Sequence, residues 1–77
     1  MRIDIGPSDD HHRLDRLRSA LAAVGATGEP FEIGVGLNEF FVGNRRLTVY
    51  RDAWAVDLEG PDAIVREVIA GMEGDAG

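Results

Sequence analysis

The chain has 77 residues, enough for one small domain and too few for two. Its 44% hydrophobic and 29% charged residues are typical of a globular protein rather than a disordered one. It has no cysteine, which excludes disulfides and thiol catalysis, and its net charge of −6 disfavours nucleic acid and anionic membranes as partners. We therefore expect a single domain over residues 1–73, with a frayed tail at 74–77.

The location of the protein is predicted from two features. No segment resembles a signal peptide, and no apolar run approaches the ~20 residues needed to cross a membrane. All eight basic residues are arginine, and alanine, glycine, valine and aspartate are abundant, which indicates a GC-rich bacterial genome. We therefore expect a cytoplasmic bacterial protein.

The first two predicted elements are a short strand and an amphipathic helix. Residues 2–5 alternate polar and apolar side chains, as a strand does. Ser8, Asp9 and Asp10 supply N-cap candidates for a helix at about 9–24. Apolar residues spaced three or four apart form its stripe: Leu14, Leu17, Leu21 and Val24.

A run of strands is predicted between the two helices. The strands lie near 31–36, 39–42, 45–50 and 54–59. The clearest pattern is Gly43-Asn44, a dipeptide suited to a two-residue hairpin turn. The apolar alternation changes parity before residue 40, so we expect a break or bulge near residues 36–38.

The pairing of the last two strands can be tested by parity, because a one-residue slip moves every side chain to the opposite face. A two-residue turn at 51–52 brings the apolar side chains together, whereas a three-residue turn puts Arg46 and Thr48 among them. We therefore predict the even turn. It gives a core face made of Phe40, Val42, Leu47, Val49, Trp54, Val56 and Leu58.

The opposite face of the predicted sheet is mixed. Leu37, Phe41 and Tyr50 lie among charged residues there, and the same register places Arg46 opposite Asp57 as a cross-strand ion pair. Contiguous exposed apolar surface often marks a protein interface. The alternatives are that one helix covers each face, or that scattered exposed aromatic side chains have no role.

The last predicted element is a helix at about 61–72. Pro61 suits the first helical position, and Asp62 suits the positive end of the helix dipole. Its apolar stripe is Ile64, Val65, Val68, Ile69 and Met72. The predicted fold is α+β, in the order β-α-β-β-β-α, with a mostly antiparallel sheet and both helices packed on one face.

Residues 9–12, Asp-Asp-His-His, form the most prominent cluster of chemically active side chains. Histidine and carboxylate together suit zinc, nickel or manganese, and His11 and Asp15 are one helical turn apart. A transition-metal site wants three or four protein ligands, and the charge of Arg16 disfavours a cation beside His12. We expect a capped, solvated helix start, with His11, His12 and Asp15 as weak metal candidates.

Motifs for catalysis or cofactor binding do not emerge. Neither serine lies in a nucleophile-elbow context. Gly34-x-Gly36 lacks the third glycine and the following helix of a dinucleotide fingerprint, so a strand bend explains it better. Arg45, Arg46 and Arg51 lie near aromatic residues, as in single-strand nucleic-acid binding, but the net charge of −6 weighs against it. We expect no enzyme activity, no cofactor and no membrane partner.

The sequence therefore predicts a small non-enzymatic protein-interaction or regulatory module that self-associates through the sheet face. The predicted contact residues are Leu37, Phe41, Arg46 and Tyr50, and the partner is a second copy or another protein. Two alternatives stay open. One is an acidic inhibitor or immunity-type protein that binds a basic partner. The other is a metal- or small-ligand-binding domain that uses Asp9, His11, His12 and Asp15.

Overall fold

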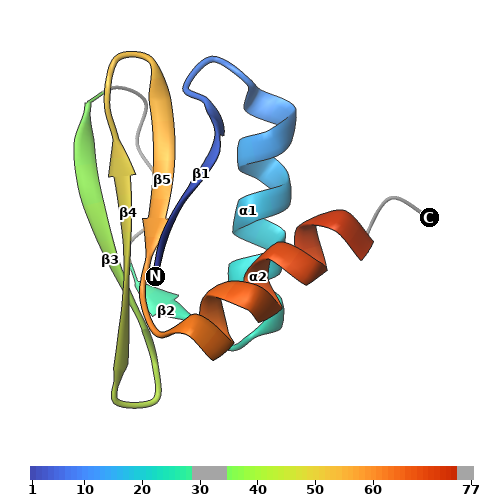
Figure 1. Cartoon of the computed structure of the whole chain (residues 1–77). Coiled ribbons are helices and arrows are strands. Elements are labelled where there is room, and N and C mark those ends of the chain that lie inside the picture. Colours follow the sequence, from blue (N-terminus) through green and yellow to red (C-terminus); the bar gives the residue numbers. More distant parts are fainter. Residues whose placement is uncertain (29–34, 75–77) are drawn as a thin grey trace.

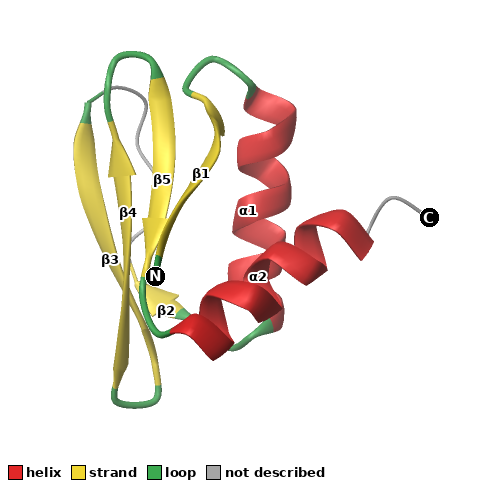
Figure 2. Ribbon diagram, in the orientation of Figure 1, coloured by secondary structure: helices red, strands yellow, loops and turns green. Residues whose placement is uncertain are grey.

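The computed structural model describes residues 1–28 and 35–74. Within these ranges two helices pack on one face of a five-stranded sheet, which confirms the predicted α+β class (Figure 1). Figure 2 shows the same two layers coloured by element type. The elements are β1 (Arg2–Pro7), α1 (His11–Ala23), β2 (Thr27–Gly28), β3 (Gly36–Val42), β4 (Arg45–Arg51), β5 (Ala55–Glu59) and α2 (Asp62–Gly74).

The strands are antiparallel to their neighbours, and their spatial order is β1-β5-β4-β3-β2. β2 to β5 follow one another across the sheet as a meander. β1 is the first strand of the chain, yet it lies beside β5, the last (Figure 1). The connection through α1 therefore carries the chain from one edge of the sheet to the other.

The core lies between the sheet and the two helices. Its buried side chains are Ile5, Leu17, Ala20, Leu21, Phe40, Leu47, Val49, Val56, Leu58, Val65, Val68 and Met72. The set contains every predicted core residue of the sheet except Val42 and Trp54. Val42 packs against this core while partly buried, whereas Trp54 is 84% exposed.

The hairpin between β3 and β4 has the predicted turn. Val42 pairs with Arg45, so only Gly43 and Asn44 stand between the strands. Gly43 has a φ of 63°, a left-handed conformation that glycine adopts at little steric cost. A glycine at the first central position suits a two-residue turn that matches the twist of the strands.

The predicted turn at 51–52 is wrong. Arg51 is the last residue of β4 to pair with β5, and its partner is Val56, so the turn between the paired positions, here called the β4–β5 loop, spans four residues, 52–55, instead of two; the last of them, Ala55, already pairs with Pro7 of β1. The physical reason is the side chain of Asp52, whose Oδ1 accepts the backbone N–H groups of Trp54 at 2.8 Å and Ala55 at 2.6 Å. Because the loop grows by an even number, the strands keep their parity while Trp54 moves from the sheet into the loop.

The predicted bounds of β3 also change. The strand begins at Gly36 rather than at residue 39, and it pairs with β4 in one regular register as far as Val42. A bulge within residues 36–38 is therefore wrong, whereas the alternative of a break before β3 stays untested, because residues 29–34 lie outside the described ranges. Most of the strand predicted at 31–36 lies outside the described residues. β2 was predicted as loop, because a two-residue strand is too short to show alternation.

β1 runs two residues beyond its predicted end and contains a bulge. Asp4 pairs with Asp57 and Gly6 with Val56, so Ile5 is the extra residue. The Ile5 side chain stays in the core, and its carbonyl accepts a hydrogen bond from Nε of Arg13 on α1. This contact ties the first helix to the sheet edge.

The helices begin and end close to their predicted bounds. Asp10 is the N-cap of α1, and its carboxylate accepts the Arg13 backbone N–H at 3.0 Å. α2 starts after Pro61 and continues to Gly74. Among the described residues, neither helix has the length and apolar character needed to traverse a lipid bilayer.

Candidate interaction surface

The sheet face turned away from the helices, here called the open face, presents alternate side chains of all five strands. The register sorts them into rows that run across the strands. The Phe41 row holds Thr27, Phe41 and Arg46, the Thr48 row holds Glu39, Thr48, Glu59 and Arg2, and the Tyr50 row holds Leu37, Tyr50, Asp57 and Asp4. The Thr48 row lies between the other two, because its residues are two positions from each along every strand.

The four predicted contact residues lie together on this face. Leu37 pairs directly with Tyr50, and Phe41 pairs directly with Arg46. The Leu37 side chain is 58% exposed and that of Phe41 is 42% exposed. Neither helix covers them in the described part of the chain (Figure 1).

Tyr50 is less available for contact with a partner than the sequence predicts, because it already has contacts within the chain. The guanidinium carbon of Arg2 lies 4.0 Å from the centroid of its ring, and its hydroxyl donates a 2.9 Å hydrogen bond to Oε1 of Glu59. The hydrogen bond to the Glu59 carboxylate, helped by partial desolvation, raises the pKa of Tyr50 above the ordinary tyrosine value. The Tyr50 hydroxyl is therefore a donor held by its neighbour.

The predicted ion pair between Arg46 and Asp57 is wrong. The longer β4–β5 loop places Asp57 opposite Tyr50 instead of Arg46. Asp57 Oδ2 accepts from Nε of Arg2 at 3.0 Å, and Arg46 lies 3.5 Å from Oε1 of Glu39. Sequence reasoning missed Arg2 because it did not establish which strand lies beside β1.

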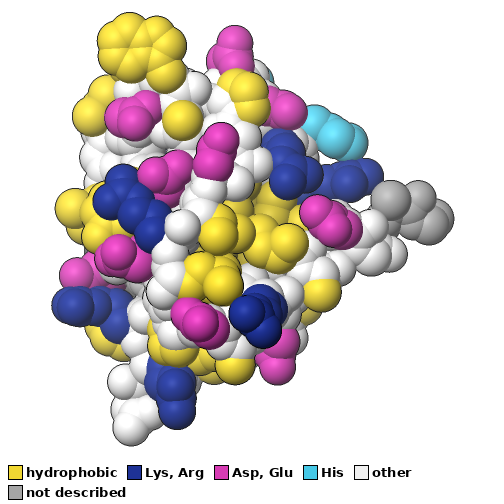
Figure 3. Space-filling view, viewed as in Figure 1, with side chains coloured by type: hydrophobic (Ala, Val, Ile, Leu, Met, Phe, Trp, Pro, Cys, Tyr) yellow, Lys and Arg dark blue, Asp and Glu magenta, His cyan; other side chains and the backbone are white. Residues whose placement is uncertain are grey.

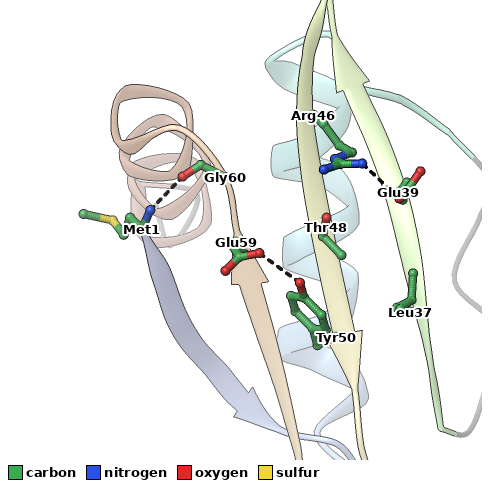
Figure 4. Close-up of a pocket in the computed structure, with 8 residues that line it drawn as sticks. All are labelled: Met1, Leu37, Glu39, Arg46, Thr48, Tyr50, Glu59 and Gly60. Carbon is green, nitrogen blue, oxygen red and sulfur yellow. Dashed lines mark hydrogen bonds and ion pairs between the residues drawn. The ribbon is translucent and has the colours of Figure 1, made fainter.

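A solvent-open hollow of about 390 Å³ lies over the Thr48 row. Its lining residues are Met1, Leu37, Glu39, Arg46, Thr48, Tyr50, Glu59 and Gly60. Thr48 forms the floor between two carboxylates. Figure 4 shows Arg46 pointing toward Glu39 and Tyr50 pointing toward Glu59, so both carboxylates that flank the hollow already have a partner.

Three further large apolar side chains are exposed outside these rows. Met1 is 42% exposed beside the hollow, Val35 is 74% exposed just before β3, and Trp54 is 84% exposed in the β4–β5 loop. The loop itself is well held, because the backbone N–H of Ser8 donates to the Trp54 carbonyl at 2.9 Å. The backbone N–H groups of Ala55 and Trp54 also lower the pKa of the Asp52 carboxyl below its ordinary value.

The helix start that carries the weak metal candidates is a solvated surface. Asp10 caps α1, and Asp15 pairs with Arg18 at 3.3 Å. His11 and His12 are exposed. Within residues 1–28 and 35–74, no three or more histidine or carboxylate side chains come close enough to share a metal ion.

The distribution of charge bears on the acidic-inhibitor alternative. Figure 3 shows acidic side chains interspersed with arginines over the visible side, rather than gathered into a field of one sign. An inhibitor that fills a basic site would present a continuous acidic surface to it. The visible side offers no support for that alternative.

Comparison of the chain with protein-family models, with curated proteins and with solved structures found no match.

Proposed function

We propose that the protein is a small interaction module that self-associates through the open face of its sheet. One observation carries the proposal: Leu37 and Phe41, two large apolar side chains on one strand, stay 58% and 42% exposed on a face that neither helix covers in the described residues. Glu39 lies between the two side chains on the same face, and apolar side chains set among polar ones are a common composition of contact surfaces.

The composition of the face also supports an interface. Tyr50 and Arg46 lie beside the two apolar residues, and tyrosine and arginine are enriched where proteins bind each other. Burying a leucine or phenylalanine side chain fully stabilises an association by about 1.5–3 kcal/mol. Leu37 and Phe41 are already partly buried in one copy, so they contribute only part of this energy, and the rest of the face must supply the remainder against the entropy cost of association. From the arginine-only basic composition we propose a bacterial source, and we propose the cytoplasm as the protein's location.

Sedimentation velocity over a wide concentration range tests the proposal. We expect the wild-type chain to associate and Leu37→Glu to weaken association by about tenfold or more, since each tenfold is about 1.4 kcal/mol. Trp54→Glu is the matched control, because it makes the same kind of change at a more exposed apolar residue outside the open face. It should associate like the wild type.

Two results would contradict self-association through this face. A wild-type chain that stays monomeric at millimolar concentration removes it altogether. Equal weakening by Leu37→Glu and Trp54→Glu removes the open face as the contact. Tyr50 is a poorer test residue, because its substitution also breaks the contacts to Arg2 and Glu59 within one copy.

A further inference from the structure

We draw no further inference here: the strongest candidate, the exposed Trp54 side chain on the β4–β5 loop that Asp52 and Ser8 hold in place, carries nothing, because nothing within residues 1–28 and 35–74 shows what covers it.

Discussion

The guanidinium of Arg2 lies over the ring of Tyr50, with its central carbon 4.0 Å from the ring centroid. Arg2 belongs to β1 and Tyr50 to β4, so the contact spans β5. On the way it touches Asp57 of β5 through a 3.0 Å ion pair. The Arg2 side chain thus connects the edge strand β1 to β4 in the middle of the sheet.

Arg2→Ala should lower the melting temperature by a few degrees, because it removes a cation–π contact and an exposed ion pair together. Arg2→Lys is the informative control. It keeps the charge near Asp57 but lacks the planar guanidinium, so it should recover only part of the loss. Thermal unfolding followed by circular dichroism measures both. Equal stability of the wild type and Arg2→Ala would show that the contact has no net effect.

Tyr50 is the only tyrosine in the chain, so its ionisation can be followed directly by ultraviolet absorbance. Its hydrogen bond to Glu59 raises its pKa, and Glu59→Gln should bring the midpoint down toward the ordinary value. The folded pKa is the higher one. The stabilisation is therefore complete below the unfolded value of about 10 and is lost as the pH rises through the folded value. Identical midpoints in the two proteins would exclude the Glu59 contact as the cause.

Asp52 should make the β4–β5 loop sensitive to acid. Its folded pKa is depressed by hydrogen bonds from the Ala55 and Trp54 amides. Its stabilisation is therefore present above the unfolded aspartate value of about 3.9 and is lost as the pH falls through the lower, folded value. Melting temperature against pH should show this acid-side loss in the wild type and a smaller one in Asp52→Asn. Parallel curves would mean that the carboxylate does not titrate with folding.

Truncation of the side chain should affect stability very little at Trp54 and strongly at Leu47. Trp54→Ser should change the free energy of unfolding by no more than about 0.5 kcal/mol, as at other exposed sites. Leu47 is fully buried, and Leu47→Ala should destabilise by about 2–5 kcal/mol. Urea unfolding monitored by circular dichroism gives both values. A large loss of unfolding free energy in Trp54→Ser would indicate that Trp54 packs in the core, as the sequence pattern predicts.

The core of the sheet could be predicted from the sequence because parity survives even-numbered changes in loop length. Leu47 and Val49 lie on the buried face with either a two-residue or a four-residue β4–β5 loop. The cross-strand partners do not survive the change. Asp57 lies opposite Tyr50 instead of Arg46, so the predicted ion pair between Arg46 and Asp57 does not form.

The sequence predicts which residues lie on the candidate surface, but it does not predict the contacts that these residues make with one another. Leu37 and Phe41 were placed on the open face by parity alone, and their exposure follows from both helices packing on the other side. The cover that Arg2 provides for Tyr50 depends on β1 lying beside β5. No local pattern encodes which strand lies next to a strand so far away in the chain.

That pairing of the first strand with the last also sets an order of events during folding. The hairpin formed by β3 and β4 closes a two-residue loop, whereas the β1–β5 ladder joins Arg2 to Glu59 and must close a much longer stretch of chain. Contacts between residues distant in sequence form slowly, because chain entropy is lost before the contacts compensate for it. We expect pulse-labelled hydrogen exchange to protect β3 and β4 amides before those of β1. The Arg2 bridge to Tyr50, and with it the finished open face, would then be among the last features of the native state to appear.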